Sequence, residues 1–151
     1  MKQSGFTLLE ILVAMLVLAI GLLGLAGLMT SSMRNNLSAS HRTQATWAAY
    51  DIVDRMRANR ANAVAAAGSY VTAMGTAATC SPAATSTTAT PAQDIAAWKN
   101  QLACVLPAGN GSIAINAGTR VATIVVQWND SRGLQDSANQ TVKSFTVETQ
   151  L

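Results

Sequence analysis

The sequence predicts an α+β protein in which one long N-terminal helix packs on a small antiparallel sheet of three to four strands. Three observations lead to this prediction. Residues 6–29 are apolar except for Glu10, residues 30–61 continue without proline or glycine, and segments of alternating apolar and polar residues follow Pro107. A small antiparallel sheet needs cover for one face, and the amphipathic part of the helix can provide it.

The apolar run from Phe6 to Met29 is long enough to cross a membrane. As a helix rising 1.5 Å per residue it would reach roughly 36 Å, against a hydrocarbon core of about 30 Å. A cleaved secretory signal has a shorter apolar region followed by a small-residue cleavage site, whereas this run continues directly into a helical pattern. We therefore expect the run to be retained and buried in lipid, in other helices, or in each at different times.

Glu10 is the single charge within this run. A carboxylate at mid-membrane costs about 2.5–3.5 kcal/mol on insertion scales, and such residues usually mark function. At headgroup depth near a helix start, the helix macrodipole favours an anion. Both interpretations can hold, because a residue in the first turns of the helix is shallow.

The segment Gly5-Phe6-Thr7-Leu8-Leu9-Glu10 follows a short basic stub and opens the apolar helix. This combination resembles the class III signal of type IV pilins and of the pseudopilins of type II secretion. The resemblance implies that a prepilin peptidase cuts between Gly5 and Phe6 and methylates the new amino group of Phe6. It also implies that Glu10 serves subunit assembly by neutralising the N-terminal amine of an adjacent subunit. The amine of its own chain, four residues earlier, is the alternative partner.

Three glycines recur at every third position of the apolar run: Gly21, Gly24 and Gly27. This spacing favours close approach of another helix, although glycine is also frequent in membrane helices generally. The run 20–28 around these glycines, the motif Asp54-Arg-Met-Arg-Ala-Asn59 and the tripeptide Gly68-Ser-Tyr70 resemble minor pilins of the PilV type, the pilus modification group.

The chain therefore divides into a leader at 1–5, a transmembrane or filament-core helix at 6–29, an amphipathic continuation at 30–61 and a periplasmic globular domain at 62–151. In the continuation, the apolar residues recur at helical spacing and predict a stripe against the sheet. The stripe comprises Ala45, Ala49, Ile52 and Met56, widened by Val53, with Trp47 and Tyr50 beside or behind it. The polar stretch 31–41 is predicted to be an exposed neck in which His41 is solvated.

Charged residues gather at the end of this helix. Asp51 with Arg55 and Asp54 with Arg57 have the spacing of side-chain ion pairs, and Arg60 follows in the last turn. A solvated face is the favoured interpretation; a patch that contacts phosphates or a neighbouring subunit is the alternative.

The globular part should begin with an irregular loop over residues 61–92 and a short helix over 94–103 that presents Ile95, Trp98 and Leu102 on one face. Three strands are predicted after it, with Phe145 and Val147 inward and a hairpin turn at Asn116-Ala-Gly118. Their expected ranges are 112–116, 120–128 and 141–149.

Two cysteines, Cys80 and Cys104, are present. In an exported chain an even count predicts one disulfide, with two unrelated buried thiols as the alternative. The cysteines and His41 lack the spacing of metal ligands, and no nucleophile is accompanied by a base. We therefore expect no metal, no cofactor and no enzymatic activity.

The resemblance implies a minor pilin that is involved in priming assembly of a bacterial type IV pilus or in forming its tip. A minor pseudopilin of a type II secretion system is the alternative, and a DNA-binding pilin in uptake is a remoter one. The implied location is the inner membrane, with the C-terminal domain in the periplasm, and then the pilus. The expected partners are other minor and major pilins, the prepilin peptidase, the inner-membrane assembly platform and membrane lipid. Only 11% of residues are charged, at a net charge of +3, which is too dilute to indicate nucleic-acid binding.

Overall fold

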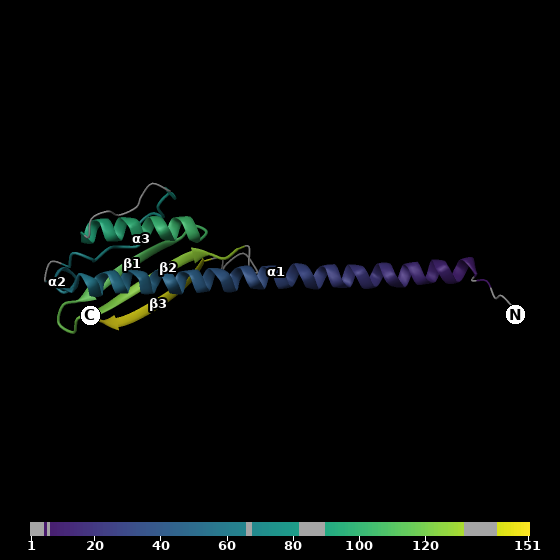
Figure 1. Cartoon of the computed structure of the whole chain (residues 1–151), viewed down its shortest axis with the longest axis horizontal. Helices are drawn as coiled ribbons and strands as arrows, with labels where there is room; N and C mark the ends of the chain where they lie inside the picture. The colour runs from purple at the N-terminus through teal and green to yellow at the C-terminus, as the bar shows by residue number, and fades with distance from the viewer. Residues whose placement is uncertain (1–4, 6, 66–67, 82–89, 132–141) are drawn as a thin grey trace.

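A computed structural model of the chain describes residues 5, 7–65, 68–81, 90–131 and 142–151. A long helix, α1, projects from a small domain that contains every other element (Figure 1). The elements in chain order are α1 (Leu8–Ala58), α2 (Arg60–Ala63), α3 (Pro91–Val105), β1 (Asn110–Asn116), β2 (Val121–Asn129) and β3 (Val142–Gln150). The predicted α+β class, with a long helix packed on a small antiparallel sheet, is confirmed.

Helix α1 ends slightly earlier than the sequence predicted. The expected boundary was at residue 61, but Asn59 leaves the helical conformation at φ −115° and ψ 44°, while its N–H still donates to the carbonyl of Arg55. The four-residue α2 then starts at Arg60. Asparagine is a weak helix former, and the Asn59 side chain donates to the hydroxyl of Tyr70 at 3.3 Å, so tertiary contact holds it at the break.

The sheet has the strand order β1-β2-β3 and is antiparallel throughout. In β2 every second side chain is buried, namely Ala122, Ile124, Val126 and Trp128. Ile124 is paired with Ile113 of β1 and with Val147 of β3, so these side chains share the inner face. Phe145 and Val147 also pack against the core, as predicted.

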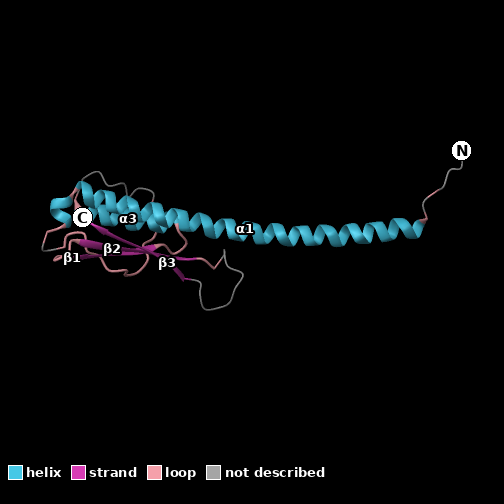
Figure 2. Ribbon diagram, turned by 90° about the horizontal axis from the view of Figure 1, so that it is seen from below, coloured by secondary structure: helices cyan, strands magenta, loops and turns pink. Residues whose placement is uncertain are grey.

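Two helices, rather than α1 alone, cover this inner face. Helices and strands form two layers (Figure 2), with α3 beside α1 and close to β1. Helix α3 runs from Pro91 to Val105, longer than the predicted range 94–103, because Pro91 occupies its first turn, where the missing N–H has no intrahelical partner to lose. Trp98 and Leu102 of α3 are fully buried.

The predicted disulfide is present between Cys80 and Cys104, at a sequence separation of 24. It joins the segment before α3 to the last turn of that helix. Loop closure of this length stabilises by about 3–4 kcal/mol in the chain-entropy model. We expect the Cys80→Ser/Cys104→Ser double variant to lose stability of that order in urea unfolding. An unchanged unfolding midpoint would show that the bridge is dispensable.

Candidate functional site

The helix start places Glu10 at the beginning of the apolar segment. Thr7 caps the helix, since its hydroxyl accepts a hydrogen bond from the N–H of Glu10 at 3.3 Å, and Glu10 lies in the first turn. The carboxylate therefore sits at the positive end of the helix dipole. Gly5 precedes the helix in non-helical, exposed backbone. Phe6, the predicted site of cleavage and methylation, lies outside the described residues.

Beyond Glu10, the N-terminal half of α1 is exposed along almost its whole length. All its large apolar side chains between Leu8 and Met33 are at least half exposed. Helix α1 contains a stretch long and apolar enough to span a membrane, and none of that stretch is buried within the chain. Burial of so large an apolar surface must come from lipid or from other chains.

The three predicted packing glycines lie on this exposed half. At Gly21, Gly24 and Gly27, an added Cβ would have no heavy atom of the described chain within 4 Å apart from those of the adjoining helix backbone. Their surface is thus open to another helix, but no partner helix is present, and the packing role stays a prediction.

The predicted exposed neck is wrong at two positions. His41 and Ser38 are both buried, because α1 meets the end of β2 one to two turns earlier than expected. The Ser38 hydroxyl donates to Asp130 Oδ2 at 2.5 Å, and His41 Nδ1 lies 3.5 Å from Asp130 Oδ1. We call Ser38, His41 and Asp130 the junction cluster. His41 is therefore not solvated, and it helps to fix the angle at which the helix leaves the domain.

The junction cluster brings together the residue types of a catalytic triad without the geometry of one. In a hydrolase the serine hydroxyl is hydrogen-bonded to the histidine, and the carboxylate orients the histidine through a second hydrogen bond. Here Asp130 lies between the other two residues and accepts the hydrogen bond of the Ser38 hydroxyl directly. The Ser38 hydroxyl is therefore hydrogen-bonded to a carboxylate. The described contacts connect α1 to the residue that follows β2, which is a structural role.

We expect Asp130→Ala to lower the free energy of unfolding by about 2–4 kcal/mol. The substitution leaves the buried Ser38 hydroxyl and the His41 ring without their acceptor. Chemical unfolding of the protein in detergent measures the effect. Asp54→Ala, which removes an exposed ion pair with Arg57, should cost less than about 1 kcal/mol. Equal losses in the two variants would contradict a structural role for the junction cluster.

The arginines at the end of α1 and the start of α2 all contact other groups of the chain. Arg55 pairs with Asp51 at 3.0 Å and with Asp94 at 3.5 Å. The Arg57 guanidinium lies 3.6 Å from Asp54 and donates to the Thr149 hydroxyl at 3.0 Å. Arg60 donates to the carbonyl of Leu151 at 3.0 Å. Both predicted ion pairs are present, and these side chains help to tie α1 to α3 and to the end of the sheet.

Tyr70 lies at the centre of a buried polar network beside these arginines. Its hydroxyl donates to Asp94 Oδ2 at 2.5 Å, and Asp94 in turn faces Arg55. Burial and the hydrogen bond to Asp94 raise the pKa of Tyr70 from 10.0 to about 12. The folded state thus favours the neutral phenol.

This pKa shift predicts a loss of stability at alkaline pH. A group whose pKa is raised on folding stabilises the protein fully below its unfolded pKa, here near 10. The contribution of about 2–3 kcal/mol is lost as the pH rises from 10 through 12. Tyr70→Phe should flatten this part of the stability profile, measured by urea unfolding between pH 8 and 12. The exposed Tyr50, replaced by phenylalanine, is the control that should leave the profile unchanged.

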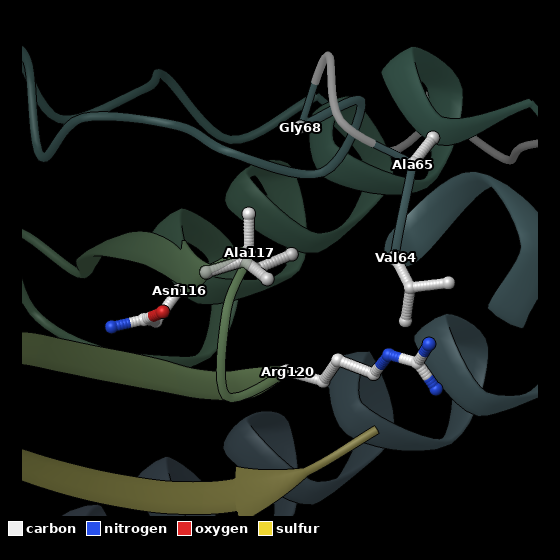
Figure 3. A pocket seen from close by; sticks show the side chains of 7 residues that line it. Val64, Ala65, Gly68, Asn116, Ala117 and Arg120 are labelled. Atoms are coloured by element: carbon white, nitrogen blue, oxygen red, sulfur yellow. The ribbon is translucent and has the colours of Figure 1, made fainter.

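A small cavity between α2 and the β1–β2 hairpin has a volume of about 30 Å³, and Val64 and Arg120 face each other across it (Figure 3). A water molecule occupies about this volume. Among the residues that the structure describes, no group of three histidine, cysteine, aspartate or glutamate side chains could hold a metal ion.

Residues 1–26 match the family model described as the prokaryotic N-terminal methylation motif. No curated protein and no solved structure matches the chain significantly. The motif and the long apolar helix together support a type IV pilin-like protein of a pilus or a pseudopilus. They also suggest that a single helix anchors the chain in a membrane.

Proposed function

We propose that this chain is a minor pilin of a bacterial type IV pilus, a structural subunit involved in priming assembly or in forming the tip. The observation that supports this most is α1, half of which packs on the sheet while the other half exposes a continuous apolar surface. Such a helix can lie in lipid before assembly and bundle with the helices of other subunits afterwards. Other minor and major pilins are therefore the proposed partners.

The proposed maturation follows from the methylation motif. A prepilin peptidase removes residues 1–5 and methylates the amine of Phe6 at the cytoplasmic face of the inner membrane. The domain then lies in the periplasm, where the disulfide between Cys80 and Cys104 can form. Mass spectrometry of the membrane-extracted protein tests this step. A mature chain that begins after Met29 would contradict the proposal.

A minor pseudopilin of a type II secretion system is the second candidate, because the methylation motif is common to both kinds of subunit. Deletion of the coding sequence separates the two proposals. Loss of surface fibres with normal exoprotein secretion supports the pilus, and the reverse supports the secretion system.

We do not extend the proposal to DNA uptake or to catalysis. The arginines that suggested a phosphate-binding patch are Arg55, Arg57 and Arg60, and each contacts another group of the same chain. The Ser38 hydroxyl donates its hydrogen bond to Asp130 and not to the His41 ring. The contacts of these residues are those expected of a structural subunit.

A further inference from the structure

Strand β3 lies at an edge of the sheet, at the margin of the domain opposite to α3 (Figure 1). Each of its nine residues, Val142–Gln150, pairs with one residue of β2. The strand therefore contains no bulge, and it contains no proline. Bulges and prolines are two of the features by which proteins block an edge strand, so this edge can still pair with a further strand.

The hydrogen-bond pattern shows which backbone groups of β3 face outward. The N–H of Leu151 donates to the carbonyl of Arg120 at 3.0 Å, so the odd-numbered residues at this edge bond to β2. In an antiparallel ladder the direction of the backbone groups alternates from residue to residue. The N–H and C=O groups of Ser144, Thr146 and Glu148 consequently point away from β2. Within the described part of the chain, no backbone hydrogen bond outside the sheet involves these three residues.

The opposite edge of the sheet shows what such outward groups bind. Ile113 of β1 faces outward in the same way, and it exchanges two backbone hydrogen bonds with Thr72, of 3.0 and 2.9 Å. A segment of the same chain thus pairs with the middle of the β1 edge. Among the described residues, no segment pairs with the outer edge of β3 in this manner.

The inner side chains of β3 supply a second observation. Phe145 and Val147 face the core but are only partly buried. Their partners on β2, Val126 and Ile124, are completely buried. A further strand with apolar residues on its inner face would cover the exposed sides of Phe145 and Val147.

These features specify the chemistry of the molecule that fits this edge. Outward backbone groups recur about every 6.8 Å along a strand, a spacing that another extended backbone matches. A second copy paired antiparallel through its own β3 does not fit a chain anchored in one membrane. Helix α1 and strand β3 run in the same general direction (Figure 1), so the rotation that pairs two β3 strands would point the two apolar helix halves in opposite directions.

From these observations we infer that the outer edge of β3 binds an extended segment of a different protein chain, which adds a strand to the three-stranded sheet. The segment presents apolar residues on the face toward α1 and polar residues on the other face. This inference goes beyond the proposed function and holds for either kind of fibre, because it concerns the folded domain alone.

The test uses the full chain in neutral detergent micelles and a fluorescein-labelled peptide with the sequence of residues 142–150, which has the required alternation. Fluorescence anisotropy should show saturable binding. Backbone N-methylation at peptide positions 144, 146 and 148 blocks one edge of the peptide, and methylation at 143, 145 and 147 blocks the other. Because an added strand pairs through one edge only, one methylated peptide should bind at least about tenfold less tightly than the other.

Two variants of the protein test the edge of β3 itself. Thr146→Pro removes one outward N–H at a position where an edge strand tolerates proline, and it should weaken peptide binding at least about tenfold. Thr146→Ala keeps this N–H and should bind the peptide as the unmodified protein does. The comparison of the two methylated peptides needs no variant, so it decides the question even if Thr146→Pro does not fold.

Four results would overturn the inference. The first is no binding of the unmodified peptide, and the second is equal binding of the two methylated peptides. The third is unchanged affinity in Thr146→Pro when its unfolding midpoint matches that of the unmodified protein. The fourth is a dimer of the full chain, seen by sedimentation, that Thr146→Pro dissociates, because the edge would then belong to a second copy. A failure to bind peptide would leave the fibre-assembly experiments unaffected, so the two proposals can fail separately.

Discussion

Glu10→Ala is expected to reduce incorporation of the protein into fibres by at least about a hundredfold while membrane insertion continues. Removing one partner of a buried ion pair typically costs about 3–5 kcal/mol, because the amine of Phe6 would be left uncompensated among apolar helices. Insertion is spared, since an apolar side chain replaces a carboxylate in the membrane segment. Immunoblots of sheared fibres and of washed membranes measure the two steps separately.

The nature of the Glu10 interaction is tested by two further variants. Glu10→Gln retains a hydrogen-bond acceptor without the charge and should assemble poorly, whereas Glu10→Asp keeps the charge and should assemble better than either. Normal amounts of the alanine variant in sheared fibres would refute a charge-pairing role. The open glycine face of α1 would then remain as the candidate determinant of bundling.

Trp98→Ala is expected to produce the largest loss of domain stability, about 3–5 kcal/mol. The Trp98 ring is completely buried between the two helices and the sheet, and its Nε1–H donates to the carbonyl of Ala48 in α1 at 2.8 Å. The loss is a large part of the net stability of about 5–15 kcal/mol that is usual for a domain. Thermal unfolding followed by circular dichroism measures the difference.

Gly111 provides the matched test of this packing. A Cβ at Gly111 would overlap the Trp98 ring, so Gly111→Ala alone should destabilise the domain by about 1–3 kcal/mol. In the Trp98→Ala background the same substitution should cost much less, because the Trp98 ring is gone and the remaining close neighbour is the end of the flexible Leu102 side chain. Additive losses in the double variant would show that the two residues do not share this contact.

Most of the fold could be predicted because its signals are local. The spacing of Ala45, Ile52 and Met56 predicted which face of α1 is buried, and the alternation in β2 predicted the inner face of the sheet. The junction cluster was missed although both patterns extend into it. His41 continues the helical stripe four positions before Ala45, and Asp130 continues the alternation of β2 after Trp128. Because these residues are polar, their position in the pattern was not interpreted as burial. The contact between His41 and Asp130 also spans 89 positions in sequence, so no local pattern indicates it.

The sequence by itself determined that the chain has an apolar helix of membrane length with an acidic residue in its first turns. It also determined that this helix continues as an amphipathic segment and that strands follow, one face of which the helix can cover. Hydrophobic length and periodicity are properties of neighbouring residues and need no tertiary information. Only the tertiary structure decided where α1 meets the sheet, that α3 shares the covering layer, and that Arg55 and Tyr70 converge on Asp94. Those outcomes depend on buried polar groups finding partners far along the chain, and a linear pattern does not specify which partner each will find.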